Sequence, residues 1–427
     1  MKKVPRLRFR GFSEDWELCK LSGVIEKLSG GASIKPTDYL EDGIRTIPKG
    51  AVNATGIADL SGSKYISEDF FEKNITSHVH TNNLVTSLRD LVPSAPNMGR
   101  IVRIEGDEEQ FLMPQGVYKL ELFEGMDGDF LISFSNSDKY RKIISAEKNG
   151  STQVHIRNGE FLNIDINLPS KYEQKKIGAF FKQLDNTITL HQRKLDQLKN
   201  LKNAYLQLMF VSNGPENSTV PKLRFANFTE EWELCGFFDT IEDTIDFRGR
   251  TPKKLGLDWS DNGYLALSAL NVKHGYIDSN IDAHYGNQEL YDKWMSGKEL
   301  RKGQVLFTTE APMGNVAQIP DNTGYILSQR TIAFETKKNR ITDDFLAVLL
   351  GSPKIFNELS SLSSGGTAKG ISQKSLSQLR IQIPCSISEQ KEIGIFFKQL
   401  NETITLHQNK LDQLKDLKKS YLQNMFI

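Results

Sequence analysis

A 38-residue stretch that occurs twice is the feature that most constrains this 427-residue chain. Residues 173–210 read EQKKIGAFFKQLDNTITLHQRKLDQLKNLKNAYLQLMF, and residues 389–426 read EQKEIGIFFKQLNETITLHQNKLDQLKDLKKSYLQNMF. The copies agree at 29 of 38 positions and are offset by 216 residues throughout. A period this long is typical of duplicated domains and not of a solenoid.

Apolar residues in each copy recur at steps of three and four, which predicts an α-helix with a narrow apolar seam. Ser170 and Ser386 stand three residues before Glu173 and Glu389, the spacing of an N-terminal capping box. About 40 residues at about 1.5 Å each make a rod of roughly 60 Å. The seam positions are Ile177, Phe181, Leu184, Ile188, His191, Leu195, Leu198, Ile393, Phe397, Leu400, Ile404, His407, Leu411 and Leu414.

Each rod needs a partner for its seam, and the other copy is the obvious one. Two copies of one unit are usually related by a two-fold axis, which would lay the rods antiparallel. His191 would then face His407 close to that axis. We interpret the two histidines as neutral seam residues; a pH switch or a metal pair is the alternative.

Composition excludes several classes of protein. Hydrophobic content of 38% and charged content of 25% are those of a globular chain, and a net charge of +1 means that any basic surface is local. No apolar run approaches the length of a membrane span, and MKKVPRLRFR lacks the apolar segment of a signal peptide. Three cysteines without CxxC spacing indicate a reducing compartment, so we expect a cytoplasmic protein.

The duplication extends beyond the helix. VPRLRF at 4–9 returns as VPKLRF at 220–225, WELC follows in both halves, and Ala-Pro followed by Met-Gly occurs near 95 and 311. Between these matches the halves diverge, with short β-rich runs and with helices expected near 129–147 and 344–361. We therefore predict an α+β fold, in which two similar mixed α/β domains are joined by two long antiparallel coiled-coil helices with pseudo-two-fold symmetry. The predicted boundaries are 1–169 and 220–385 for the globular domains, 170–211 and 386–427 for the helices, and 212–219 for the linker.

Most catalytic signatures are missing, since the sequence contains no GxxxxGK[ST], HExxH or GxSxG. One loose match remains. Pro320-Asp321 followed by Glu335-Thr336-Lys337 fits the pattern of metal-dependent nucleases, in which two acids hold the metal. The same segment also reads as a turn, so a nuclease is an alternative of low weight.

The divergent domains carry basic and amide side chains of the kinds that read bases and hold phosphates. Arginine pairs with guanine, asparagine or glutamine with adenine, and lysine binds phosphate. For any one of these residues a solvated charged surface is the better interpretation; as a set they favour a nucleic-acid surface. The candidates are Lys35, Arg45, Lys49, Asn53, Lys64, Asn97, Arg100, Arg250, Lys253, Lys254, Lys273, His274, Gln329, Arg330, Lys369 and Lys374.

These features together resemble the specificity subunits of type I restriction-modification enzymes. The resemblance covers the whole chain and depends on the duplicated halves, on the Glu-Gln-x-x-Ile-Gly-x-Phe-Phe opening and Tyr-Leu-Gln-x-Met-Phe close of each long helix, and on the shared start of each half. It implies two target-recognition domains that each read one half of a split DNA sequence, with the helices as an antiparallel spacer.

The resemblance also implies a subunit that is not itself an enzyme, binds no cofactor and contains no catalytic or metal site. Its partners would be double-stranded DNA, two methyltransferase subunits that bind S-adenosylmethionine and modify a flipped adenine, and restriction subunits that use ATP and Mg²⁺. No membrane is implied. A coiled-coil scaffold without a DNA role is the other alternative.

Overall fold

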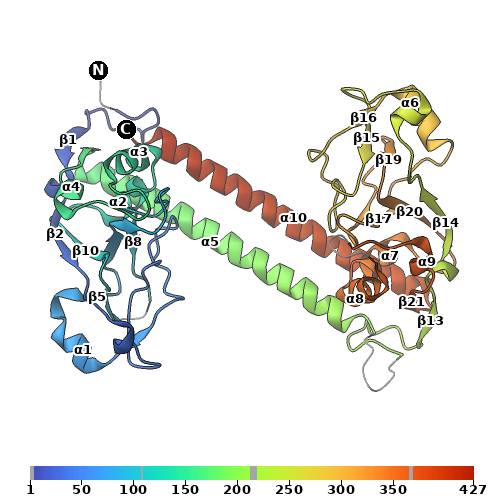
Figure 1. Ribbon diagram of the computed structural model, residues 1–427, viewed down its shortest axis with the longest axis horizontal. Coiled ribbons are helices and arrows are strands. Elements are labelled where there is room, and N and C mark those ends of the chain that lie inside the picture. Colours follow the sequence, from blue (N-terminus) through green and yellow to red (C-terminus); the bar gives the residue numbers. More distant parts are fainter. Residues whose placement is uncertain (1–3, 107–108, 212–218, 365–368) are drawn as a thin grey trace. The chain divides into compact units, whose positions relative to one another are not determined.

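The computed structural model describes residues 4–106, 109–211, 219–364 and 369–427, so the predicted linker at 212–219 lies almost wholly outside the described residues. The chain forms two compact units. Unit 1 is Met1–Arg193 together with Asn409–Ile427, and unit 2 is Lys194–Gln408. Each unit therefore combines one globular domain with parts of both long helices (Figure 1).

A four-stranded antiparallel sheet forms the centre of unit 1. Its order is β2 (Ile25–Gly30), β10 (Val117–Leu122), β6 (Leu84–Ser87) and β8 (Ile101–Arg103). The helices α2 (Gly128–Ser135) and α3 (Asp138–Glu147) supply Phe130, Phe134 and Tyr140 to the core on this sheet. Smaller strand pairs surround it: β1 (Glu17–Lys20) with β12 (Asp165–Leu168), β3 (Ile44–Arg45) with β4 (Tyr65–Ile66), β5 (His78–His80) with β9 (Gln110–Leu112), and β7 (Arg89–Asp90) with β11 (Val154–His155). The helices are α1 (Glu68–Lys73), α2 (Gly128–Ser135), α3 (Asp138–Glu147) and α4 (Asn158–Leu162).

Unit 2 repeats the same central sheet. Its order is β14 (Ile241–Asp246), β20 (Thr331–Thr336), β17 (Val305–Thr308) and β18 (Val316–Gln318), again antiparallel throughout. Both units have a second apolar core beside this sheet. The halves diverge there, because unit 2 has a three-stranded second sheet where unit 1 has separate strand pairs. The other elements are β13 (Trp232–Gly236) with β21 (Arg380–Pro384), the sheet β16 (Tyr285–Gly286), β15 (Tyr264–Leu267) and β19 (Tyr325–Leu327), and the helices α6 (Gln288–Met295), α7 (Asp343–Leu350), α8 (Pro353–Leu362) and α9 (Gln373–Leu376).

The predicted long helices are α5 (Lys171–Leu208) and α10 (Ile387–Asn424), each of 38 residues. Both begin as the sequence predicts, because the hydroxyls of Ser170 and Ser386 accept hydrogen bonds from the backbone N–H three residues later, at 3.4 and 3.5 Å. Helix α5 ends at Leu208, before the predicted end at 211, since Phe210 and Val211 turn into the core of unit 2.

Within each unit the two helices run antiparallel. In unit 1, Phe180 stacks edge-to-face on Tyr421 at 5.0 Å, and further along α5 Asp185 pairs with Lys418 at 2.5 Å. In unit 2, Tyr205 meets Phe396 at 5.0 Å. Positions along α5 rise as their partners along α10 fall, which confirms the predicted antiparallel arrangement inside each unit.

The seam positions are all buried or half-buried. His191 belongs to unit 1 and His407 to unit 2, so their predicted pairing stays a prediction.

The residues just after each long helix pack into the core of a globular domain: those after α10 into unit 1, and those after α5 into unit 2. Phe426 packs among Trp16, Phe130 and Phe181 in unit 1, with ring centroids 5.6–6.4 Å apart. At the equivalent position in unit 2, Phe210 packs against Trp232, Phe345 and Phe397 at 5.8–6.1 Å. Burying one phenylalanine is worth about 2–3 kcal/mol, so this contact ties each helix end to its domain. The Tyr-Leu-Gln-x-Met-Phe close thus has a structural reason.

Candidate nucleic-acid interface

Each unit has a cleft at the same end of its central sheet. Val117, the first residue of β10, pairs with Ser87, and Thr331, the first residue of β20, pairs with Thr308. These pairs make Val117 and Thr331 equivalent positions. Gln115 and Gln329, each two residues before the first residue of β10 or β20, are therefore equivalent as well. Both glutamines line their clefts, which have volumes of about 700 Å³ in unit 1 and about 660 Å³ in unit 2.

The turn between each glutamine and its strand has a left-handed residue. In unit 1 this residue is Gly116, with φ of +101°, and in unit 2 it is Arg330, with φ of +63°. Glycine adopts this conformation freely, whereas a side-chain-bearing residue costs roughly 1–2 kcal/mol. Arg330 is nevertheless exposed there, and its Nε lies 2.9 Å from Glu310. Strain of this kind is often found at functional sites.

The unit 2 cleft is lined by aromatic and basic side chains. Arg250 lies 4.1 Å above the ring of Phe247 and donates a hydrogen bond to the carbonyl of Trp294, so its guanidinium is held in place at the wall. Gln329 donates to the carbonyl of Arg250 at 3.1 Å. Lys253 is exposed at the rim. Four predicted residues from two distant stretches of the sequence therefore meet in one cleft.

The aromatic part of this cleft was not predicted. The ring of Trp259 stacks on that of His284, with centroids 5.5 Å apart, and lies 5.6 Å from Trp294. His284 also lies 3.3 Å from the carboxylate of Asp282. Planar rings beside an arginine and a glutamine suit contact with nucleobases.

The unit 1 cleft brings together Lys49 and Asn97 with Arg89, Gln115 and His155. Lys49, Arg89 and His155 are exposed cations or potential cations, and Asp90 is the carboxylate among them. Lys49 and Asn97 were predicted from the sequence. Gln115 was missed because its match to Gln329 follows from strand register, whereas the sequences on either side have diverged.

Three predicted residues of unit 1 have their polar groups engaged inside the domain. Arg45 pairs with Glu109 at 3.0 Å, and the amide of Asn53 donates to the carbonyls of Ala51 and Ile57. Arg100 donates to the carbonyl of Pro96 at 2.9 Å and to Asn136, and burial lowers its pKa to about 10. These side chains hold loops in shape.

The remaining predicted residues lie outside the lining of the two clefts. Lys64 packs over the ring of Tyr39 at 4.8 Å, and Lys254 donates to the carbonyl of Gly249 at 2.7 Å. His274 contacts the carbonyl of Gly351 through Nε2 at 3.2 Å, next to the half-buried Lys273. The other three are exposed lysines: Lys35, Lys369 and Lys374.

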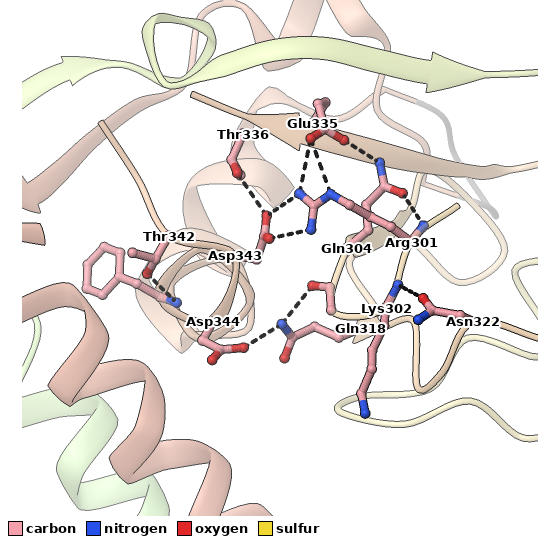
Figure 2. Close-up of polar contacts among 12 residues, drawn as sticks. Arg301, Lys302, Gln304, Gln318, Asn322, Glu335, Thr336, Thr342, Asp343 and Asp344 are labelled. Atoms are coloured by element: carbon pink, nitrogen blue, oxygen red, sulfur yellow. Dashed lines mark hydrogen bonds and ion pairs between the residues drawn. The ribbon is translucent and has the colours of Figure 1, made fainter. Parts of the chain in front are cut away.

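The nuclease-like residues are occupied by structural contacts. Glu335 lies 3.1 Å from Arg301 and accepts a hydrogen bond of 3.0 Å from Gln304, and Arg301 is also paired with Asp343 (Figure 2). Asp321 accepts three hydrogen bonds, two from Thr323 and one from Tyr325, which lower its pKa and fix a turn. In the described part of the chain, no group of three or more acidic, histidine or cysteine residues is placed to bind a metal.

The long helices expose leucines at repeated positions. Leu190 and Leu201 on α5 correspond to Leu406 and Leu417 on α10, at the same offset of 216 residues. Their exposed fractions are 67%, 43%, 68% and 42%. Large apolar side chains this exposed often belong to interaction surfaces, and here both helices carry the same pair. None of the helices in the described residues is long and apolar enough to cross a membrane.

Comparison with known proteins identifies one family. The model described as "Type I restriction modification DNA specificity domain" matches residues 13–200 and 237–416. The MjaVIII type I restriction enzyme specificity subunit of Methanocaldococcus jannaschii is 23% identical over 96% of this chain and 91% of its own length. The EcoKI specificity subunit of Escherichia coli is 24% identical over 70% of this chain and 64% of its own.

A solved structure shares the fold. The crystal structure of the type I restriction-modification S subunit from M. genitalium superposes with a TM-score of 0.66 and covers 99% of both chains at 12% identity. The duplicated sheets and the two long helices are therefore an architecture that has been seen by experiment.

Proposed function

This chain belongs to the type I restriction-modification DNA specificity family, and from that premise we propose that its two globular domains read the two halves of a bipartite DNA target. The chain is the specificity subunit of such a complex and is itself non-catalytic.

The observation that carries the proposal is the pair of clefts at the same end of the same sheet. Their shared frame, with Gln115 and Gln329 at one position, gives each domain the same approach to a duplex. Their linings differ, with Arg89 and His155 in unit 1 and Arg250, Trp259 and Arg330 in unit 2. Two clefts that are built on equivalent strands but lined by different side chains are what two different half-sites require.

The side chains at the clefts have the chemistry of base readout. A glutamine amide can bond both N6 and N7 of adenine, and a guanidinium can bond both O6 and N7 of guanine. Each such pair contributes about 1–3 kcal/mol of discrimination. Lysines at the rim, such as Lys49 and Lys253, would bind phosphates and fix the register without reading the sequence.

The long helices set the distance between the half-sites. Helix α5 begins in unit 1 and ends in unit 2 without a break, and α10 begins in unit 2 and ends in unit 1. A rod of roughly 60 Å spans at most about 18 base pairs, and offsets at both ends reduce the working distance to about one turn of DNA.

The partners of the helices are methyltransferase subunits, one for each repeated surface. The leucine pair on α5 and the identical pair on α10 offer two equal docking sites, which suits two copies of one protein. Those subunits would bring S-adenosylmethionine and methylate adenine, and restriction subunits would bring ATP-dependent cleavage. These partners act in DNA modification, which places the complex with the chromosome in the cytoplasm.

The test is a methylation map. The chain is co-expressed with its methyltransferase subunit in a host without other adenine methylation, and methylated adenines are located across the genome. We expect one split motif with adenines on opposite strands. Methylation at the same motif after residues 236–384 are scrambled would overturn the assignment of the second half-site to unit 2. A stable complex that methylates nothing would favour the scaffold alternative.

A further inference from the structure

The two units differ at one equivalent place, where a recognition domain meets the long helices. In unit 1 this place is a cleft of about 420 Å³ between the loop at Thr55, the start of α3 and both helices. Its lining contains two carboxylates and four cations, Arg100, Lys415, Lys418 and Lys419. Asp185 pairs with Lys418 at 2.5 Å, and Asp138 accepts a hydrogen bond from Gln423 at 2.9 Å.

Unit 2 lacks both of those carboxylates. Asn401 stands at the position of Asp185, 216 residues later in the repeat. The residue equivalent to Asp138 is Pro353, because Ser137 and Ser352 cap α3 and α8 in the same way. The lysine is kept, since Lys202 is the repeat partner of Lys418. The lysine that is paired with a carboxylate in unit 1 therefore has no carboxylate at the equivalent positions in unit 2.

Lys202 is half-buried. Its counterpart Lys418 lines the unit 1 cleft together with Asn136, the residue after α2, and the counterpart of Asn136 in unit 2 is Gly351, the residue after α7. Among the described residues, no carboxylate forms an ion pair with Lys202, and burial lowers its pKa. It is close enough to His274 for its charge to help lower the pKa of that histidine, although burial is the larger cause. His274 uses Nε2 to donate to the carbonyl of Gly351, so the loop that carries it is held against the end of α7.

A half-buried ammonium without a counter-charge costs free energy that an anionic ligand would recover. We propose that Lys202, with His274 and Lys273 on the neighbouring loop, binds a backbone phosphate of DNA at the inner edge of the second half-site. The proposal rests on the proposed function, since it takes unit 2 to be a DNA reader. The equivalent lysine of unit 1 is already paired with a carboxylate, since Lys418 lies 2.5 Å from Asp185.

A phosphate fits the site better than an acidic side chain of a protein partner. The site combines Lys202 on α5 with the loop of Lys273 and His274, which belongs to the domain whose cleft contains Arg250 and Gln329. A ligand that contacts both Lys202 and this loop must follow the edge of that domain. A DNA backbone leaving the half-site follows such a path. A partner docked on the exposed leucines would have no need of the loop at Lys273.

The experiment exchanges the charges between the two units. The full complex with methyltransferase is made with N401D, which gives Lys202 a carboxylate, and with D185N, which removes the carboxylate of Lys418. Affinity for the target duplex and for an unrelated duplex is measured between about 50 and 200 mM salt. One phosphate contact contributes about 0.9 to the slope of log K against log salt.

We expect N401D to lower that slope by about one contact on both duplexes, to weaken binding several-fold, and to leave the methylated motif unchanged. D185N should raise the slope by a similar amount. K418Q is the matched control and should leave the slope unchanged, whereas K202Q should reproduce N401D. Thermal unfolding of each complex shows that the variants are folded.

An unchanged slope in N401D and K202Q would overturn the proposal. A loss of methyltransferase association with unchanged DNA binding would also overturn it, since the ammonium would then meet an acid of the partner. Failure of the proposed function is separate, because it would appear as equal affinity of the unaltered complex for target and unrelated duplexes. The sequence-independent phosphate contact would still register in the slopes.

Discussion

Arg8 donates two hydrogen bonds of 2.7 Å to the carboxylate of Glu173, and this bidentate pair ties the start of the chain to the first turn of α5. The Glu173 side chain is fully buried, and hydrogen bonding to it raises the pKa of Arg8. Arg224 and Glu389 repeat the pair at the same distances in unit 2, where Trp232 adds a third donor to Glu389. The glutamate of the predicted capping box therefore holds the N-terminal arm of its own half.

Replacing Arg8 by alanine should destabilise unit 1 strongly. The buried Glu173 carboxylate would lose its counter-charge, a change that typically costs about 3–5 kcal/mol. In thermal unfolding of the full chain, R8A should lower the temperature at which unit 1 unfolds, and R224A should lower the temperature at which unit 2 unfolds. A double variant, R8M with E173L, should recover much of the loss. An R8A chain as stable as the parent would contradict this role.

Lys202 and Lys418 should respond in opposite ways to replacement by methionine. K202M removes a half-buried charge without a carboxylate partner, so it should stabilise unit 2 by roughly 1 kcal/mol. K418M leaves Asp185 without its partner and should destabilise unit 1. Differential scanning calorimetry of K202M and K418M measures the two changes in Tm. Equal changes of the same sign would contradict the prediction.

The gain from K202M should depend on pH in a defined direction. Burial lowers the pKa of Lys202 in the folded chain below its ordinary value of 10.5. At pH values between the lowered pKa and 10.5, the unfolded chain therefore binds more protons than the folded chain. The cost of Lys202 is then present in full at neutral pH and declines as pH rises through the lowered pKa. The difference in Tm between K202M and the parent should narrow toward pH 10.5; a widening gap would rule out this origin.

Lengthening both long helices should change the spacing of the DNA target and leave its half-sites alone. Seven residues inserted after Lys194 and after Lys410, at equivalent positions, preserve the seam because the seam repeats every seven residues. The rods grow by about 10 Å, so the gap in the methylated motif should widen by about three base pairs. Methylation mapping checks this, and the original spacing retained by a folded, active variant would be the contrary result.

The elements that the sequence predicted best are those that repeat. The long helices follow from their seams and capping serines, and their antiparallel direction follows from symmetry, because Phe180 and Tyr205 meet equivalent partners in the two units. The antiparallel central sheets were only outlined, since their strands are short and are separated by long irregular segments.

The clefts were harder to predict because they depend on side chains brought together by strand register. Lys49, Asn97, Arg250, Lys253, Gln329 and Arg330 were named from residue type alone. Residue type cannot show that the Arg100 guanidinium is buried against Asn136, nor that Gln115 lies at the position of Gln329. The importance of Asn401 appears only once the structure shows that its repeat counterpart, Asp185, pairs with Lys418.

The central claim is that each cleft reads its own half of the target, and one measurement tests it directly. Methylated adenines are mapped for the complex with Q115A and for the complex with Q329A and R330A, against the parent complex. Q115A should relax the first half of the motif and keep the second, and the Gln329 and Arg330 changes should do the reverse, each by about 10- to 100-fold in preference at the affected base pair. Relaxation of both halves by either variant, or of neither half by both, would contradict the account.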